Sequence, residues 1–291
     1  MIIPRSAISA GPGPQRIPHG IGTYDRLAAE FAALALRAGA VIMDIYEKGC
    51  EIRLKGDGSP VSEADERAEA VILAGLSQLL PGCCVVAEEA SARGEAPALK
   101  DEFILVDPLD GTREFVSRNG EFTVNIALIS QGAPVAGAIF APALGELWFA
   151  GAAAHHVAAA PGQALPEAAA WRTIRARAAP EGGLTVLSSR SHGDAATNRF
   201  LEQITIASHR SAGSSLKFCL LAEGKADLYP RFGPTMDWDI AAGDAILRAA
   251  GGVTLDLGKQ PKIYGLPGTG HRNASFIALG DADLAQKLQF S

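Results

Sequence analysis

Apolar side chains recur at helical spacing in two stretches near the start of the chain. Residues 24–48 place them on one face, which predicts an amphipathic helix. The apolar positions are Leu27, Phe31, Leu34, Ala38, Val41 and Ile45. A second helix is expected from Ser62 to Leu80, because Ser62 can cap its start and Pro81-Gly82 ends it.

Short apolar runs predict the strands that follow. Cys84–Ala87 and Phe103–Val106 are two such runs, and acidic residues follow both. The segment "EFTVNIALIS" (121–130) alternates and is rich in β-branched residues, so it is expected to be a strand with "PVAGAIFAPALGELWFA" (134–150) as its hairpin partner.

The second part of the chain alternates strands with helices. Residues 151–183 are rich in Ala, Pro and Gly, which predicts a surface hairpin and a linker. Beyond them, strands are expected at 184–188 and 226–229, and helices at 195–204, 214–223 and 239–250. We therefore expect a disordered tail (1–21), an α+β domain (22–182) that carries the candidate metal site described below, and an α/β domain (183–291).

Composition narrows the class of protein. The 291 residues carry a net charge of −6, so the charge gives no reason to expect nucleic-acid binding, which would need a basic face. The apolar region 132–162 is interrupted by Pro134, Pro142 and Glu146, so no membrane span is expected, and residues 1–20 lack the apolar core of a secretory signal. The spacing of the four cysteines fits no zinc site, which favours a reduced, cytoplasmic protein.

Acidic residues stand where predicted elements begin or end. Glu88 and Glu89 follow one strand, Asp107 and Asp110 follow the next, and Asp65 lies in the first turn of the second helix. Asp239 is expected to open the last predicted helix. Helix capping alone could explain Asp65 and Asp239, and Asp-Pro and Asp-Gly are common turn dipeptides.

Asp107 and Asp110 together are harder to explain by local structure. Two carboxylates around Pro108 would repel each other unless a cation lies between them, and Mg²⁺ prefers oxygen ligands of this kind. Gly111 lets the backbone approach a ligand closely, and Thr112 begins a predicted helix whose N-terminus suits an anion. Carboxylate-bound metal beside such a terminus favours phosphate-ester hydrolysis.

These motifs resemble the inositol monophosphatase superfamily, whose members are lithium-sensitive, Mg²⁺-dependent phosphatases. The resemblance lies in "VDPLDGT" (106–112), "WDIAAGDA" (238–245) and "AEEAS" (87–91). It implies a layered αβαβα sugar-phosphatase fold. Stretches such as "GDGSPVSEAD" (56–65) and "GSSLKFCLLAEGKADLYPRFGPT" (213–235) are similar to its branch of CysQ-type 3′(2′),5′-bisphosphate nucleotidases, and the likeness covers most of the chain from residue 22 on.

The resemblance implies a site that holds two to three Mg²⁺ ions. The positions that match the family's metal ligands are Glu88, Asp107, the Leu109 carbonyl, Asp110 and Asp239. Asp65 and Thr112 match the pair that activates water, with Glu88 beside them as a catalytic residue. The positions expected to contact substrate are Leu109, Asp110, Gly111, Thr112, Arg190, Ser214, Lys217, Arg231 and Asp239. Glu89 is expected to act indirectly or through water.

Much of the substrate prediction rests on Arg231. The inositol branch has an acid at the matching position, whereas an arginine suits a second phosphate. Arg190 and Lys217 could add positive charge or could be solvated surface charges. The chain departs from the family at Ala87, where Ser is frequent, at Arg113, where Lys is common, and at Asn273-Ala274, where Asn-Pro is usual.

The expected reaction is in-line attack of metal-bound water on the 3′-phosphate of adenosine 3′,5′-bisphosphate, giving AMP and phosphate, with the sulfonated nucleotide as another substrate. Alternatives are an inositol or broader sugar-phosphate phosphatase, a haloacid-dehalogenase-type phosphatase that forms a phospho-aspartate, and a nucleotide-binding regulator. We expect a cytoplasmic monomer or homodimer. Peripheral contact with the inner face of the cell membrane is an open alternative.

Overall fold

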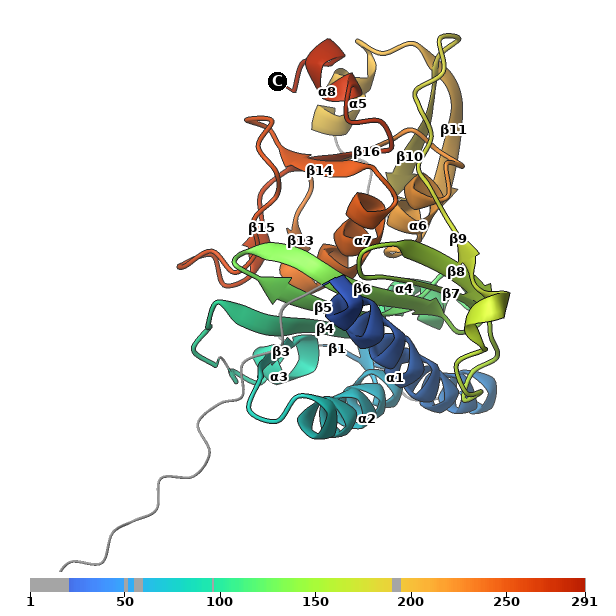
Figure 1. The fold of residues 1–291 in the computed structure, drawn as a ribbon, viewed down its shortest axis with the longest axis vertical. Helices are drawn as coiled ribbons and strands as arrows, with labels where there is room; N and C mark the ends of the chain where they lie inside the picture. Colours follow the sequence, from blue (N-terminus) through green and yellow to red (C-terminus); the bar gives the residue numbers. More distant parts are fainter. Residues whose placement is uncertain (1–20, 50–51, 55–59, 96, 190–194, 291) are drawn as a thin grey trace, which may run out of the picture.

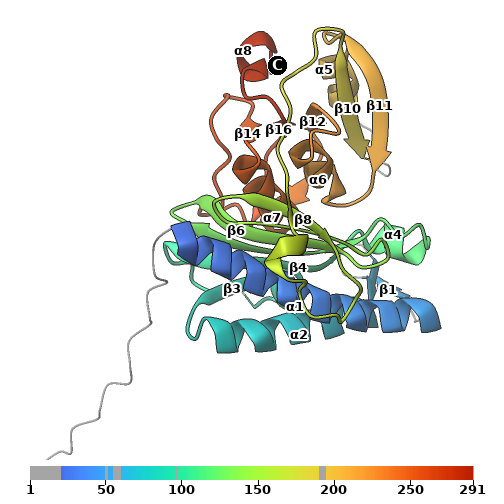
Figure 2. The same cartoon turned by 45° about the vertical axis from the view of Figure 1, so that its right-hand side comes forward.

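Five layers of secondary structure make up the molecule, as the computed structural model describes it for residues 21–49, 52–54, 60–95, 97–189 and 195–290. One large sheet has seven strands and the other has five. Figures 1 and 2 show helices, the seven-stranded sheet, further helices, the five-stranded sheet and short helices, in that order. This is the αβαβα arrangement that the resemblance implies, and it is confirmed.

The seven-stranded sheet has helices on both faces. Its order is β3-β4-β5-β6-β7-β8-β9, with β3 and β4 parallel and the other neighbours antiparallel. Along β4 (Glu102–Asp110), Ile104 and Val106 join the core beneath α1 and α2, whereas Phe103 and Leu105 join the core on the other face. A strand buried on both faces is apolar at every position, which explains why "FILV" does not alternate.

Most expected elements of this first half have bounds close to the expected ones, but the strand expected at 103–106 continues to Asp110. The strands at 52–54 and 60–62 and the helix at 88–92 were not expected. The helices are α1 (Ile21–Lys48), α2 (Glu63–Leu79), α3 (Glu88–Ala92) and α4 (Thr112–Val116). The strands are β1 (Ile52–Leu54), β2 (Pro60–Ser62), β3 (Cys84–Ala87), β4, β5 (Thr123–Ser130), β6 (Ala133–Ala141), β7 (Glu146–Ala150), β8 (Ala154–Ala158) and β9 (Arg172–Thr173). A short 3₁₀ turn, η1 (Ala168–Ala170), precedes β9.

The five-stranded sheet has the order β11-β10-β12-β16-β14 and packs over α6 and α7 (Figure 1). Its strands are β10 (Leu184–Ser189), β11 (Ile206–Ala212), β12 (Leu228–Arg231), β14 (Val253–Asp256) and β16 (Phe276–Leu279). Its helices are α5 (Ala195–Leu201), α6 (Leu216–Ala222), α7 (Asp237–Ala249) and α8 (Leu284–Lys287). A two-stranded ladder of β13 (Thr235–Met236) and β15 (Arg272–Asn273) lies at the start of α7.

Three expectations about elements need correction. The segment 151–183 is more than a linker, because β8 and β9 extend the seven-stranded sheet. Strands β11, β14 and β16 were not expected, and the polar sequence of β11 gives no apolar run. Asp239 does not open α7: Met236 is the N-cap residue, and the Met236 N–H donates to Asp239 Oδ2 at 2.7 Å from the third helical position.

Two further expectations remain predictions. The described strands of the two large sheets are separated between Thr173 and Leu184, but the domain division at 182/183 stays a prediction. The expected disordered tail falls almost entirely on residues 1–20, which lie outside the described residues. In the part of the chain that is described, no helix is both long enough and apolar enough to cross a membrane.

Candidate active site

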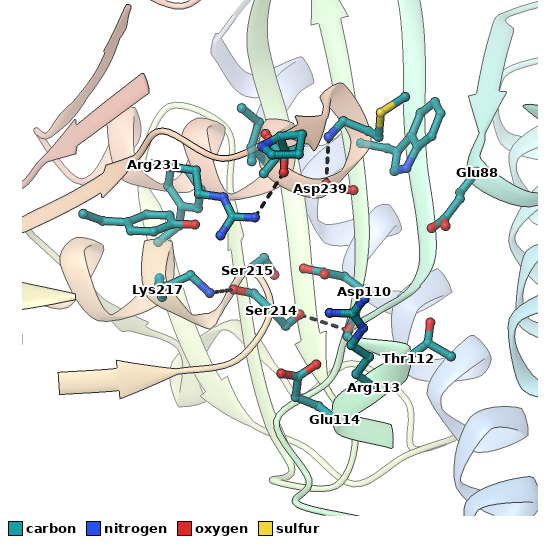
Figure 3. A pocket seen from close by; sticks show the side chains of 18 of the residues that line it. Glu88, Asp110, Thr112, Arg113, Glu114, Ser214, Ser215, Lys217, Arg231 and Asp239 are labelled. Atoms are coloured by element: carbon teal, nitrogen blue, oxygen red, sulfur yellow. Dashed lines mark hydrogen bonds between the residues drawn. The ribbon is translucent and has the colours of Figure 1, made fainter. Parts of the chain in front are cut away.

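A cavity of about 420 Å³ lies where the end of β4 meets α6, β12 and α7 (Figure 3). The expected site residues that line it are Glu88, Asp110, Gly111, Thr112, Ser214, Lys217, Arg231 and Asp239. Asp107, Leu109 and Asp65 lie behind this lining, in contact with residues of the cavity wall. Arg190 lies outside the described residues.

The end of β4 is shaped to expose its carboxylates. The pairing of β4 with β5 shifts register between Asp107 and Asp110, so the strand bulges at Pro108 and Leu109. The Leu109 N–H donates to Asp107 Oδ1 at 3.1 Å, which fixes the buried Asp107 side chain at the bulge. The acids expected in a turn after the strand therefore belong to the strand itself.

Gly111 is required where β4 passes into α4. Its φ of +92° lies in the left-handed region, and an added Cβ would approach the Glu121 carbonyl and the Ser214 Cβ, each at 3.3 Å. This turn places Gly111 and Thr112 on the cavity wall.

Glu88, Asp107, Asp110 and Asp239 form one electrostatically linked acidic cluster. Burial is the largest cause that raises the pKa of Asp107, and the charges of Glu88, Asp110 and Asp239 raise it further. Asp107 is also hydrogen bonded to Glu88. Burial likewise raises the pKa of Asp110 and Asp239, and the Asp110 charge adds to the effect on Asp239. Carboxylates in contact need a shared proton or a cation to lie stably side by side.

This cluster fits a hard divalent cation by the chemistry of its donors. Its ligand atoms are carboxylate oxygens that repel one another, with Asp107 buried and Glu88, Asp110 and Asp239 half-buried at the cavity, and Mg²⁺ neutralises such a group of charges. Over the residues described, however, no three or more Asp, Glu, His or Cys side chains already stand in an arrangement that would hold an ion. Closing a coordination shell would therefore require these side chains to turn inward.

The two carboxylate oxygens of Asp65 accept hydrogen bonds from different parts of the protein. Oδ2 accepts hydrogen bonds from the Ser62 N–H at 2.8 Å and from the Ser62 hydroxyl at 2.7 Å, which completes a capping box at the start of α2. Oδ1 accepts from the Thr112 hydroxyl at 3.2 Å. The capping explanation and the expected Asp65–Thr112 pair are thus both present, on different atoms.

The wall opposite the acids is basic. Lys217 is buried, and its Nζ donates to the carbonyls of Ala212 at 3.1 Å and Ser214 at 2.6 Å. Burial lowers the pKa of Lys217 to about 8. Arg231 is also buried, with Nη2 donating to the Pro234 carbonyl at 3.1 Å, and its Nε has no hydrogen-bond partner within the described residues.

A chain of hydroxyl groups joins the two walls. Ser214, with a φ of +53°, donates to the Asp110 carbonyl at 3.0 Å and lies 2.6 Å from the Thr123 hydroxyl. The Ser215 hydroxyl donates to Asn125 Oδ1 at 2.8 Å, and Asn125 Nδ2 donates to Asp110 Oδ2 at 3.4 Å. The loop before α6 is thereby attached to β5 and to Asp110.

Some cavity residues were not predicted as site residues. Arg113, Glu114, Tyr229, Trp238 and Arg272 also line the cavity. Arg113 directly follows the quoted motif "VDPLDGT" and Trp238 begins the motif "WDIAAGDA", so their position in the sequence could have identified them. Arg272 gives no such signal, because only the pairing of β15 with β13 brings it to the cavity.

Comparisons with known proteins agree with this fold and show the family. The family model described as "Inositol monophosphatase family" matches residues 24–288. The layered fold with an acidic strand end facing a cavity is that of a phosphatase, and the chain belongs to the inositol monophosphatase family.

Several proteins that are similar to this chain are named as CysQ or as a 3′(2′),5′-bisphosphate nucleotidase. The chain is 44% identical over 234 residues to the 3′(2′),5′-bisphosphate nucleotidase CysQ of Escherichia coli K12, covering 79% of this chain and 91% of that protein. It is 47% identical to the Salmonella typhimurium CysQ over 77% of this chain and 90% of the relative. The crystal structure of Bacteroides thetaiotaomicron CysQ matches with a TM-score of 0.74 at 36% identity, covering 88% of this chain and 97% of that one.

Proposed function

We propose that this chain is a Mg²⁺-dependent 3′(2′),5′-bisphosphate nucleotidase that hydrolyses the 3′-phosphate of adenosine 3′,5′-bisphosphate to AMP and phosphate. The observation that carries the proposal is a cavity with an acidic cluster at one end and buried Arg231 at the other. Nucleotidase relatives with up to 47% identity support the same choice.

The acidic end would hold two to three Mg²⁺ ions through Glu88, Asp107, Asp110, Asp239 and the Leu109 carbonyl. Bound there, Mg²⁺ would make water a nucleophile at neutral pH and would stabilise the departing oxygen. The residues of the chain supply the remaining functions, which are to orient water, to hold the phosphate and to select the substrate.

Thr112 and Asp65 would orient the attacking water. Because the Thr112 hydroxyl donates to Asp65 Oδ1, its oxygen is left to accept a hydrogen bond from water in the cavity. Asp65 Oδ2 is held by Ser62, which keeps the carboxyl group in place while Oδ1 accepts a proton. The Gly111 and Thr112 amides lie at the start of α4, where they could bind phosphate oxygens.

Arg231 would bind the phosphate that is not hydrolysed. Its guanidinium is buried, charged and provided with an unused Nε donor, so an anionic group would satisfy it better than a sugar hydroxyl. Lys217 would assist mainly by its charge, since two of its donors already bind backbone carbonyls. Contacts from Arg190 stay a prediction.

Phosphate release tests the proposal directly. Adenosine 3′,5′-bisphosphate, inositol 1-phosphate and fructose 1,6-bisphosphate are compared at equal Mg²⁺ concentrations, and the nucleotide should be preferred. A tenfold preference for inositol 1-phosphate, equivalent to about 1.4 kcal/mol of transition-state binding, would exclude the nucleotidase assignment. A trapped phospho-aspartate would favour the dehalogenase-type mechanism, and Mg²⁺-dependent nucleotide binding without turnover would favour a regulator.

Four finer properties stay predictions. The sulfonated nucleotide is expected to be a substrate as well, and inhibition by lithium is expected from the family. We also expect a cytoplasmic location, with or without peripheral contact at the inner membrane face, and a monomer or a homodimer.

A further inference from the structure

The short helix α3 presents Glu88 to the acidic cluster but has no cap of its own. Its N-cap residue is Ala87, whose φ of −119° and ψ of 148° are those of an ordinary N-cap, but whose methyl group cannot accept a hydrogen bond. The first backbone N–H groups of a helix have no partner within the helix. They must find acceptors elsewhere if the turn is to be well ordered.

Glu69 of α2 supplies these acceptors. Its Oε2 accepts from the Glu89 N–H at 2.8 Å and from the Ala90 N–H at 3.3 Å. Its Oε1 accepts from Arg93 Nη2 at 3.2 Å, and Arg93 is the C-cap residue of the same helix. Glu69 is only 2% exposed, so it holds both ends of α3 from inside the protein.

Helix α2 thereby supports two parts of the site from one face. Asp65 contacts Thr112, and Glu69, four residues later and so on the same face, holds the helix that begins at Glu88. Glu88 in turn is hydrogen bonded to Asp107. A shift of the α3 first turn would therefore move a proposed metal ligand relative to the other acids.

We infer that Glu69 is a positioning residue for metal binding, which substitutes for the missing N-cap at Ala87 and holds Glu88 toward Asp107. This inference rests on the proposed function to the extent that Glu88 is a metal ligand. It predicts that serine at position 87, whose hydroxyl could accept from the Glu89 or Ala90 N–H, makes Glu69 less necessary.

Calorimetric titration of the metal-free protein with Mg²⁺, without substrate, tests the inference. Glu69→Ala should raise the Mg²⁺ dissociation constant at least tenfold, and Glu69→Gln, which keeps one carbonyl acceptor but turns an amide toward Arg93, should raise it less. Adding Ala87→Ser to Glu69→Ala should recover at least half of that loss on a logarithmic scale. Ala87→Ser alone should change binding less than twofold.

Turnover separates positioning from a general loss of structure. At saturating Mg²⁺, Glu69→Ala should recover kcat to within threefold and should keep the wild-type KM for substrate. The matched control is Glu66→Ala on the same helix, because Glu66 is exposed and pairs with exposed Arg53; it should bind Mg²⁺ like the wild type.

Two results would overturn the inference. One is wild-type Mg²⁺ affinity in folded Glu69→Ala or, should that variant not fold, in Glu69→Gln. The other is failure of Ala87→Ser to restore any affinity. Preference for another phosphate ester would defeat only the proposed function, since these titrations contain no substrate.

Discussion

The acidic and basic walls of the cavity are built in different ways. The acidic wall is centred on one short stretch, in which β4 delivers Asp107 and Asp110 and the next residues form the Gly111-Thr112 turn. Helices α3 and α7 complete it with Glu88 and Asp239. The basic wall is assembled from α6 and β12, which place Lys217 and Arg231 there, and from β15, which adds Arg272. A local motif therefore provides the centre of the first wall, whereas only tertiary packing brings the second wall together.

The two walls also differ in how their charges are compensated. The acids repel one another at close range, which raises the pKa of Asp107 beyond the effect of burial. The bases donate to backbone carbonyls, as Lys217 and Arg231 both do. The acidic wall is therefore expected to govern catalysis, and the basic wall to govern the choice of substrate.

Substitution of Asp107 should have the largest effect. Asp107→Asn removes the carboxylate at the centre of the cluster, so kcat/KM should fall roughly 10³-fold. Because the substitution also removes a buried like charge, the thermal midpoint in EDTA should be equal to or higher than that of the wild type. Phosphate release and thermal unfolding measure the two effects, and a fully active variant would contradict the metal scheme.

Asp65 should have the next largest effect, and its two oxygens can be tested separately. Asp65→Asn turns an NH2 donor toward the Thr112 hydroxyl in place of the Oδ1 acceptor. The hydroxyl can then no longer pass a proton to residue 65, so kcat should fall about 10²-fold. Ser62→Ala removes only the capping hydroxyl and should cost about 1 kcal/mol of stability with turnover near the wild type. Equal losses of turnover in both variants would mean that capping alone explains Asp65.

The same contrast explains how much could be predicted from the sequence. The two long helices, several strands and the acidic residues at their ends were predictable because apolar runs, turn dipeptides and capping boxes are local, whereas the layered arrangement was implied by the family resemblance. Strand β11 was missed because its segment "IASHRSA" carries exposed polar side chains on an edge strand. Arg272 was missed because it reaches the cavity through a pairing with residues 36 or more positions earlier in the chain, Thr235 and Met236. Patterns along the chain do not contain such pairings.

Arg231 tests the basic wall with a smaller effect. Arg231→Met should raise KM for adenosine 3′,5′-bisphosphate about 10- to 100-fold, because a charge-assisted hydrogen bond contributes roughly 1.5–3 kcal/mol. A nucleoside 3′-monophosphate, which lacks the second phosphate, should be hydrolysed equally by both proteins. Arg231→Lys keeps the charge but not the planar fork, so it should recover part of the affinity. Equal losses for both substrates would contradict a second-phosphate site.

The smallest effect is expected from the titration of Lys217. Its pKa is lowered to about 8 by burial, so the side chain is charged below that pH and becomes neutral above it. As the pH rises from 8 to 9, the charged fraction of Lys217 falls about fivefold. Over this range kcat/KM for the bisphosphate should therefore fall up to about fivefold more in the wild type than in Lys217→Met, which has no charge to lose at any pH. The dependence should be weaker in kcat, because a bound anion retains the proton on Lys217. Parallel pH profiles of kcat/KM for the two proteins would contradict a contribution of the Lys217 charge to substrate binding. They would mean that the ammonium group serves only its hydrogen bonds to the carbonyls of Ala212 and Ser214.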